Sequence, residues 1–287
     1  MVVRDGAYMI RIRALTDNEI NWRSSFIVIM LWEFASALAP GMLGGGFFFA
    51  IFILNREGIN MGKSITAVML SSFQDGVFLA IMTPIVYFLV GKERLFSTID
   101  VSPLKFGFWA VYFIILLYKV FVAYALFVNP RFVKWLLLKI FSLPILRRWK
   151  HSALETGNQL VTASNGLKNK NRKFWINSFA GTFFSWTARY SIVNCLILAF
   201  HSAPVDNLLV FARQVIMGII ILFSPTPGGS GIAEIMFKNF LGEFIAKGLS
   251  TSMALLWRIV SYYPYLIIGV IILRRWIRKH FKREEVV

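Results

Sequence analysis

The chain has 287 residues, of which 57% are hydrophobic and 16% are charged, and its mean hydropathy is +0.64. This balance excludes an ordinary water-soluble domain and is typical of a polytopic helical membrane protein. The formal net charge of +17 would suggest nucleic acid in a soluble protein. Because anionic lipid headgroups account equally well for basic segments beside membrane spans, we expect no nucleic-acid partner.

Basic residues gather in four polar segments, which the positive-inside rule places on the cytoplasmic side. These segments are residues 1–23, 131–150, 168–173 and 274–287. The segments after Val90 and after Phe200 carry few lysines or arginines, so we expect them on the outer side. The sequence therefore predicts a multi-pass plasma-membrane protein whose basic tail lies in the cytoplasm.

The side chains that usually carry enzymatic chemistry are scarce. A lone cysteine, Cys195, lies in an apolar segment, so the sequence excludes thiolate metal clusters and intramolecular disulfides. No Ser/His/Asp grouping, phosphate-binding loop or metal-ligand spacing is visible in the sequence. We therefore expect no catalytic residues, no metal and no cofactor, and we do not expect the protein to be an enzyme.

The first apolar region, residues 26–54, is interrupted near its middle by Pro40, Gly41 and the glycines 44–46. Each half has roughly 14 residues, or about 21 Å of helix, which is short for a hydrocarbon layer of about 30 Å. The pattern predicts a re-entrant hairpin of two half-length helices.

Three full crossings are expected next, at residues 65–90, 106–128 and 174–200. Pro84 would kink the first of them. Residues 131–149 alternate basic and bulky apolar side chains, which predicts an amphipathic helix at the membrane interface. The polar residues 151–173 are expected to form a cytoplasmic connection.

A second interrupted region follows. Residues 208–223 and 232–244 are largely apolar, and the segment SPTPGGSGIAE begins at Ser224 between them. Its two prolines prevent a continuous helix, so a second hairpin of half-length helices is expected. A last crossing is expected at residues 253–273, before the basic tail.

The order of crossings predicts that the two hairpins enter the membrane from opposite faces, the first from the cytoplasm and the second from outside. Each is followed by a crossing with a charge at a similar distance, Asp75 after Gly45 and Arg258 after Gly229. This pattern predicts an inverted-topology repeat with a binding site near the membrane midplane. We expect one transmembrane domain over residues 1–287. Its parts are a first repeat with the following crossing (1–130), an amphipathic cytoplasmic connection (131–173), a second repeat (174–273) and the basic tail (274–287).

Both breaks are expected to line a polar cavity, because irregular backbone at membrane depth survives only where protein or water satisfies it. Helix N-terminal ends near Phe47 and Ile232 would favour an anion, and arginine side chains suit phosphate. Carboxylates would hold the arginines in place or take protons. The candidate substrate-binding residues are Glu33, Pro40, Gly44, Gly45, Asp75, Arg189, Arg213, Pro227, Gly228, Gly229, Ser230, Gly231, Glu234 and Arg258. In the alternative interpretation, the acids and bases only lock the bundle by pairing, and the glycines only allow close helix packing.

Two segments resemble a known family. The motif SPTPGGSGIAE followed by LLWRIVSYYPYLIIGVIIL looks like the C-terminal signature of the lysylphosphatidylglycerol synthase transmembrane-region family. The earlier segment APGMLGGGFFFAIFILNREGINMGKS, with the later FQD, resembles the Pro/Gly motif and acidic residue of its N-terminal half. The resemblance covers the chain from about Trp32 onward. It implies a bacterial-type plasma (inner) membrane protein that moves lipid headgroups between leaflets.

The chain also departs from that family. Too few residues follow Leu273 for the soluble aminoacyl transferase that some members carry, so synthase activity is not expected. Members usually have about two more crossings before the first motif, whereas this chain starts with a polar segment, and a truncated gene model is one explanation of this difference. Gly46 and Phe47 stand where the family has an acidic residue just after the first glycine motif.

The favoured hypothesis is a lipid flippase that moves a membrane phospholipid through a central polar cavity. Two other hypotheses stay open. One is a transporter of a polyprenyl-phosphate carrier or of a small anionic solute, and the other is a non-transporting membrane subunit that assists a glycosyl- or acyl-transferase. A homo-oligomer, or a membrane transferase as partner, is compatible with these hypotheses.

Overall fold

A computed structural model describes residues 1–40, 46–96, 102–143, 147–200, 204–246 and 248–281. These residues form helices and turns, with no strand among them apart from one isolated bridge. The α-helices are α1 (Val2–Leu15), α2 (Trp22–Leu38), α3 (Phe47–Arg56), α4 (Met61–Val90), α5 (Lys92–Leu95), α6 (Ser102–Ala123), α7 (Pro130–Ile140), α8 (Lys150–Leu167), α9 (Arg172–Phe200), α10 (Asn207–Leu222), α11 (Ile232–Leu241), α12 (Ser250–Ser261) and α13 (Tyr263–Phe281). Short helical turns lie at Tyr124–Val128 (η2), Arg147–Trp149 (η3) and Gly242–Phe244 (η4).

Four described segments are long and apolar enough to cross a membrane. They are Met61–Val90, Gly107–Val128, Arg172–Phe200 and Ser250–His280. These segments confirm the four predicted crossings and the all-helical polytopic membrane fold. Pro84 lies inside α4, which continues as one helix past it, whereas the last crossing is divided into α12 and α13 at Tyr262.

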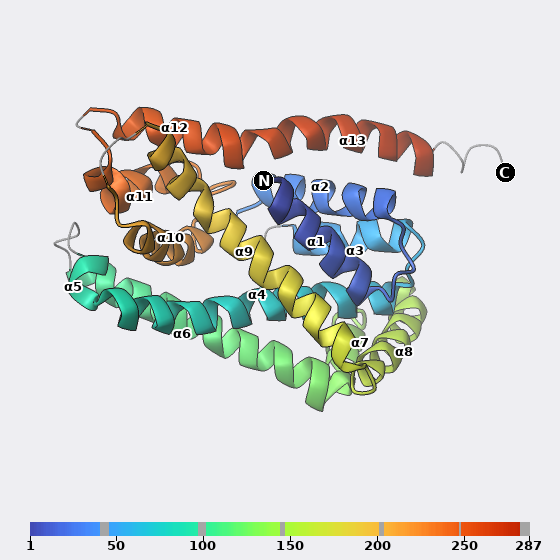
Figure 1. Cartoon of the computed structure of the whole chain (residues 1–287). Coiled ribbons are helices and arrows are strands. Elements are labelled where there is room, and N and C mark those ends of the chain that lie inside the picture. Colours follow the sequence, from blue (N-terminus) through green and yellow to red (C-terminus); the bar gives the residue numbers. More distant parts are fainter. Residues whose placement is uncertain (41–45, 97–101, 144–146, 201–203, 247, 282–287) are drawn as a thin grey trace.

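The crossings surround the interrupted helices. In Figure 1, α4 and α6 run along one side of the molecule and α12 with α13 along the other, while α1, α2, α3 and α9 lie between them. The helix–break–helix pattern predicted for both interrupted regions is present, as α2 with α3 and as α10 with α11. Residues 41–45 of the first break lie outside the described residues.

Polar side chains at the starts of several helices help to define where these helices begin. Each accepts a hydrogen bond from the backbone three residues later, which satisfies an otherwise orphaned N–H group. These capping residues are Asn21 for α2, Asn60 for α4, Asn129 for α7 and Asp206 for α10. Because the residues that follow each cap within its helix are mostly apolar, these helices can be buried or face lipid along most of their length.

The N-terminal helix differs from the solvated segment expected for residues 1–23. Helix α1 packs along α9, and the side chains of Arg4 and Arg11 are almost fully buried. The hydroxyl of Ser185 on α9 donates to the carbonyl of Arg4 at 2.9 Å. Arg4 and Arg11 are seven residues apart, so they share one helix face and enter the bundle together.

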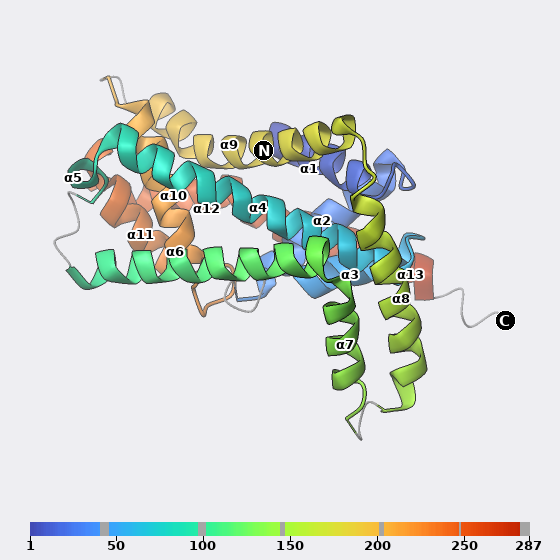
Figure 2. The same ribbon diagram turned by 90° about the horizontal axis from the view of Figure 1, so that it is seen from below.

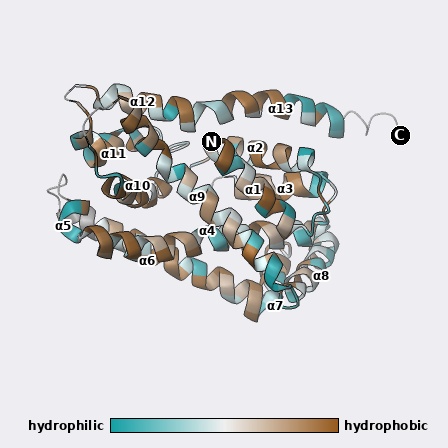
Figure 3. Ribbon diagram, viewed as in Figure 1, coloured by the Kyte–Doolittle hydropathy of each residue, from teal (hydrophilic) through white to brown (hydrophobic). Residues whose placement is uncertain are grey.

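The polar and basic parts of the chain gather at one end of the bundle. Helix α8, the C-terminal end of α13 and the connection between α1 and α2 share this end, while α5 lies at the other. Figure 3 shows hydrophobic colours along α6 and the middle of α13 and hydrophilic colours at the C-terminal end of α13. This distribution supports the predicted grouping of the basic segments on one side of the membrane.

Asp17 joins the connection between α1 and α2 to the start of α4 and to the connection between α8 and α9, all at the basic end. Its carboxylate pairs with Lys63 at 2.7 Å and with Lys170, and its φ of 56° is left-handed. Burial raises the pKa of Asp17, but hydrogen bonds from Lys170 and Lys63 outweigh burial and hold that pKa below its usual range. The pairs therefore stabilise the fold at neutral pH, and this contribution is lost as the pH falls through the Asp17 pKa.

We expect Asp17→Asn to lower the free energy of unfolding by about 1 kcal/mol or less, because the pairs are partly exposed. Asparagine tolerates the left-handed backbone, so only the charge is removed. Thermal melts in detergent should separate the two proteins at pH 7. The difference should shrink as the pH falls from about 4, the pKa of an unfolded aspartate, through the lower pKa of Asp17 in the folded protein, where the wild-type carboxylate is protonated as well. Identical melting temperatures at pH 7 would contradict this assignment.

Candidate functional site

The two breaks meet. Pro40 in the first break and Pro227 in the second form an isolated antiparallel bridge, and the N–H of Gly228 donates to the carbonyl of Ala39 at 3.4 Å. The hydroxyl of Tyr262, at the division between α12 and α13, donates to the carbonyl of Ala37 at 3.0 Å. Irregular backbone from both halves of the chain is thus joined at one place. The candidates Gly44 and Gly45 lie outside the described residues.

The second break is a compact loop that satisfies its own backbone. Gly228, Gly229 and Gly231 have φ values of 56°, 71° and 85°, which few residues other than glycine adopt. The N–H of Gly229 donates to the carbonyl of Thr226, and the N–H of Gly231 donates to the Glu234 carboxylate at 2.6 Å. These N–H groups already have acceptors, so the loop supplies shape rather than donors for an anion.

Arg258 holds this loop in place. Its guanidinium donates to the Gly228 carbonyl at 3.0 Å and to the Ser230 hydroxyl at 3.1 Å, and it pairs with Glu234 at 2.9 Å. It also lies over the ring of Tyr262, 3.8 Å from the centroid. Arg258 is buried, and most of its donors are used within the loop. For this residue the structure fits the alternative in which acid and base lock the bundle.

The close approach of Tyr262 makes Gly228 the most sensitive position of the loop. A Cβ atom there would lie 2.3 Å from the Tyr262 ring, whereas a Cβ atom at Gly231 would meet nothing within 4 Å. Because both positions have positive φ, Gly231→Ala measures backbone strain alone, and Gly228→Ala adds the clash. We expect Gly228→Ala to be less stable than Gly231→Ala by about 1–3 kcal/mol in thermal unfolding. Equal losses would show that the ring moves away freely.

A cavity of about 870 Å³ lies beside the joined breaks. Helices α1, α2, α3, α4, α6, α9, α10, α12 and α13 contribute to its wall. The sequence-predicted candidates that line it are Glu33, Asp75, Arg189, Gly228, Gly229 and Arg258. The other described candidates are not among its lining residues; they are Pro40, Arg213, Pro227, Ser230, Gly231 and Glu234.

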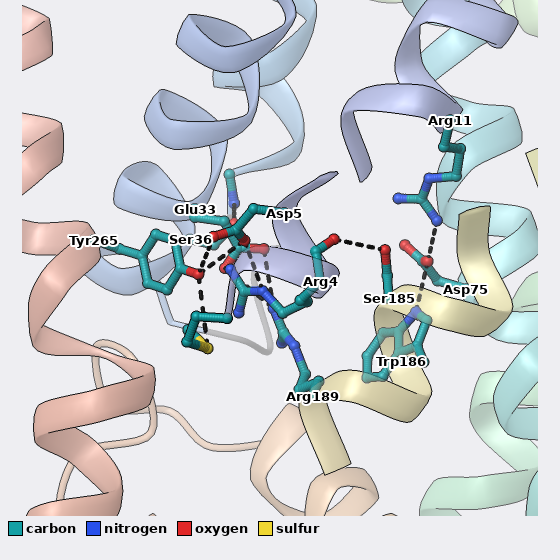
Figure 4. Close-up of polar contacts among 12 residues, drawn as sticks. Arg4, Asp5, Arg11, Glu33, Ser36, Asp75, Ser185, Trp186, Arg189 and Tyr265 are labelled. Carbon is teal, nitrogen blue, oxygen red and sulfur yellow. Dashed lines mark hydrogen bonds and ion pairs between the residues drawn. The ribbon is translucent and has the colours of Figure 1, made fainter. Parts of the chain in front are cut away.

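Arg189 on α9 is a cation of the cavity wall that is partly exposed to the cavity. Its Nη2 donates to both oxygens of Glu33, at 2.9 and 3.1 Å, while its buried Nε has no hydrogen-bond partner among the described residues. Its side chain is 33% exposed, and this exposure is to the cavity that it lines. Arg4 supports Glu33 from α1 at 3.3 Å (Figure 4). An anion in the cavity would therefore find Arg189 oriented and partly unpaired.

A second charged group surrounds Asp75 on α4. Arg11 donates to its carboxylate at 2.5 Å, and the indole of Trp186 donates to the same oxygen at 2.7 Å (Figure 4). Lys119 on α6 lies in the same wall and donates to the carbonyl and hydroxyl of Ser72, both at 2.8 Å. Neither hydrogen bond neutralises the ammonium, so Lys119 adds a positive charge to the cavity wall.

The charges of the lining residues are unequal in sign. Four cationic side chains, Arg11, Lys119, Arg189 and Arg258, face the two carboxylates Glu33 and Asp75. The rest of the wall is mostly apolar or aromatic, and it includes Trp32, Leu79 and Trp257. A positively charged, largely apolar cavity suits an anionic group attached to an apolar body.

The cavity reaches the apolar outer surface of the bundle. Among its lining residues, Phe48 on α3 is 73% exposed and Ile114 on α6 is 52% exposed. Tyr118 on α6 and Leu222 on α10 also line it and are exposed. We call these four residues the portal. The exposed surface of the portal is largely apolar and so is suited to contact with lipid rather than with water.

Arg213 does not reach the cavity, although it was expected to hold the phosphate. It is 1% exposed and donates to the carbonyls of Arg94 and Phe240, and it pairs with Glu243 at 2.9 Å. These partners join α5, α10, α11 and η4 at the opposite end of the bundle from the basic segments. The structure therefore places Arg213 in a buried contact between these elements and not in the cavity wall.

Sequence reasoning missed the contributions of α1 and α6. Arg4 and Arg11 were counted as part of a solvated segment, although their spacing of seven residues, with Tyr8 and Ile12 on the same side, is the signal of a helix with one buried face. Lys119 is a single charge in an apolar crossing, which is by default a functional candidate. Its alkyl chain lies against Gly76, one residue after Asp75.

The fold and the cavity define a polytopic α-helical membrane protein with a charged chamber where two interrupted helices meet. Among the described residues, no group of His, Cys, Asp or Glu side chains is arranged to hold a metal ion. The family model of the lysylphosphatidylglycerol synthase TM region matches residues 3–269, and the chain belongs to this family.

The chain is also similar to a UPF0104 membrane protein from Archaeoglobus fulgidus. The two are 23% identical over 271 residues, which cover 90% of this chain and 78% of that relative. No solved structure matches the chain. The family match confirms the resemblance seen in the two Pro/Gly motifs.

Proposed function

We propose that the protein moves an anionic or zwitterionic phospholipid across the membrane, with the headgroup in the central cavity and the acyl chains in the bilayer. The observation that carries this proposal is the combination of a net positive cavity wall with a lipid-facing portal. A solute carrier needs the positive wall but not the portal. A path for acyl chains needs an apolar opening at the side of the bundle, and the portal supplies one.

The phosphate is held by Arg189 and Lys119 in this proposal. Arg189 offers a guanidinium that lines the cavity and is partly exposed to it, and Lys119 offers an ammonium whose hydrogen bonds go to neutral oxygens of Ser72. Charge-assisted hydrogen bonds to phosphate are stronger than neutral ones, so both side chains favour the headgroup over water. Glu33 and Asp75 keep the arginines of the wall oriented, and Arg258 with the glycine loop closes one side.

The membrane arrangement is part of the proposal. We place the protein in a bacterial plasma membrane with the basic tail in the cytoplasm, and α2–α3 and α10–α11 as re-entrant hairpins of an inverted repeat. The grouping of α8, the end of α13 and the α1–α2 connection at one end supports this orientation. The bridge between Pro40 and Pro227 supports a shared site at the two breaks.

The test is lipid translocation by the purified protein. Vesicles containing fluorescent phosphatidylglycerol are treated with an impermeant reductant, with and without a proton gradient across the membrane. We expect the reductant to reach a larger fraction of the fluorescent lipid than in protein-free vesicles. If the reductant reaches equal fractions of the lipid in vesicles with and without the protein, whether or not a gradient is present, the result would contradict transport of this lipid.

Mass spectrometry of lipid that purifies with the protein distinguishes the other hypotheses. A stoichiometric phospholipid supports the proposal. A polyprenyl phosphate would assign the same cavity to a different lipid carrier, because its chain fits the portal equally well. Retention of neither, together with failed translocation, would favour a subunit that assists a transferase.

A further inference from the structure

Helices α7 and α8, here called the α7–α8 hairpin, project from the bundle. Figure 2 shows them side by side and running across the direction of α4 and α6, with α7 extending past the other helices, while α8 also contacts α4 near Gln159. The hairpin follows α6, whose residues Ile114 and Tyr118 form part of the portal. Helices perpendicular to the crossings lie in the plane of the membrane, at the end of the bundle that carries the basic segments.

The hairpin carries an excess of positive charge that the protein does not neutralise. Its basic residues are Arg131, Lys134, Lys139, Arg147, Arg148 and Lys150, against a single carboxylate, Glu155. Apart from Arg147, whose side chain lies outside the described part of the chain, none of these basic side chains forms an ion pair with a described carboxylate. Lys134 donates to the side-chain oxygen of Asn158 at 2.7 Å, which leaves its charge in place. The charge is therefore available to an external anion.

An apolar face accompanies these charges. Its exposed residues are Trp135, Leu136, Ile140, Leu143 and Trp149. Aromatic contacts connect this face to the exposed surface of α6. The ring centroid of Phe121 on α6 lies 5.7 Å from that of Phe132, and the Phe132 centroid lies 5.8 Å from that of Trp135. Since Phe121 is exposed on a helix long and apolar enough to cross a membrane, α7 continues an apolar surface suited to lipid.

Cationic and aromatic side chains of the hairpin also pair directly. The ammonium of Lys139 lies 4.9 Å from the centre of a Trp135 ring, and the guanidinium of Arg148 lies 3.8 Å from that of Trp149. Trp and basic side chains together are typical of the headgroup layer, where rings stay at the interface and charges reach phosphate.

We propose that the α7–α8 hairpin is a binding surface for anionic phospholipid headgroups of the cytoplasmic leaflet, placed beside the portal. Charge complementarity selects the headgroup, and the apolar face fixes the depth of the hairpin. Only the delivery of this lipid to the cavity rests on the proposed function. Binding at the hairpin does not require translocation.

The test reads lipid composition at the hairpin itself. In a Cys195→Ser background, a fluorophore is attached at Leu136→Cys, and the protein is reconstituted with phosphatidylglycerol or phosphatidylcholine carrying a nitroxide near the top of the acyl chain. We expect stronger quenching by phosphatidylglycerol. A hairpin variant without four of the charges should reduce this preference at least about threefold, because each basic residue near an anionic surface contributes to the attraction. Its substitutions are Arg131→Gln, Lys139→Gln, Arg148→Gln and Lys150→Gln.

A matched variant removes four charges from the same end of the bundle, at Arg274, Arg275, Arg278 and Lys279 of α13. It should retain the preference at Leu136→Cys. Equal quenching by both lipids in the otherwise native protein would overturn the proposal. A preference that survives the hairpin variant, or that is lost equally in the α13 variant, would overturn it as well. Because quenching is measured without translocation, a failure of transport leaves this test intact.

Discussion

Replacing Arg189 with glutamine should slow lipid translocation by roughly 10- to 100-fold while leaving the protein folded. The rate falls because the Arg189 guanidinium lines the cavity and is partly exposed there, and a hydrogen bond to a charged group contributes about 1.5–3 kcal/mol. The fold is retained because Glu33 keeps its pair with Arg4 at 3.3 Å. Initial rates in reconstituted vesicles at equal protein content measure the effect.

Arg172→Gln is the matched control. Arg172 begins the same helix as Arg189 and is exposed at the basic end. The same change of side chain there should leave the translocation rate unchanged. A wild-type rate for Arg189→Gln, at an unchanged melting temperature, would remove Arg189 from the transport path and with it the assigned headgroup site.

Arg213→Gln should have the opposite pattern, a large loss of stability with transport retained in the folded fraction. The substitution leaves Glu243 and the carbonyls of Arg94 and Phe240 without their cation. Breaking a buried ion pair in this way costs about 3–5 kcal/mol, and the partial exposure of Glu243 places the expected value near the lower end. Thermal unfolding in detergent measures the loss.

Rates per folded molecule distinguish a clamp from a ligand contact at Arg213. If Arg213→Gln is as stable as the wild type but does not transport lipid, the arginine contacts the substrate in an arrangement other than the one described, and its assignment as a clamp is wrong. Arg213→Lys should be intermediate in stability, because an ammonium keeps the charge but cannot reach acceptors on three sides with a planar fork.

The crossings and the two breaks could be predicted from the sequence because both are local properties. A run of some 20 apolar residues is long enough to span the bilayer wherever it occurs, and Pro227 with its neighbouring glycines cannot continue a helix. The family resemblance rested on the same local segments. The helix ends moved by only a few residues, as in α4, which begins at Met61 rather than at Ile65.

The choice among arginines could not be predicted, because it depends on how helices are rotated against one another. Arg189 and Arg213 both lie in apolar helices, and nothing near either one in the sequence shows which faces the cavity. Likewise, Arg4 and Arg11 lie in a polar segment whose composition is typical of solvated chain, and only the packing of α1 along α9 reveals that they are buried. A charged side chain in an apolar helix indicates an energetic cost of burial, but its position among the packed helices decides what the side chain does.

The glycine motif shows a further limit of sequence reasoning. Free N–H groups at a helix start predict an anion site, but the N–H groups of Gly229 and Gly231 are satisfied by Thr226 and Glu234. The requirement that buried backbone be paired was met inside the loop itself. The motif therefore shapes the cavity, and side chains from α6 and α9 supply its positive charge.

The meeting of the two breaks can be measured by a disulfide between Pro40→Cys and Pro227→Cys in a Cys195→Ser background. Bridge partners place their Cα atoms about 4.5–5.5 Å apart, within the range that a disulfide spans. With a protease site inserted after Asn169, membranes treated with oxidant and protease should yield two fragments that stay linked until reductant is added. If the fragments separate without reductant, the breaks do not share one site, and the cavity described between them is not the transport path.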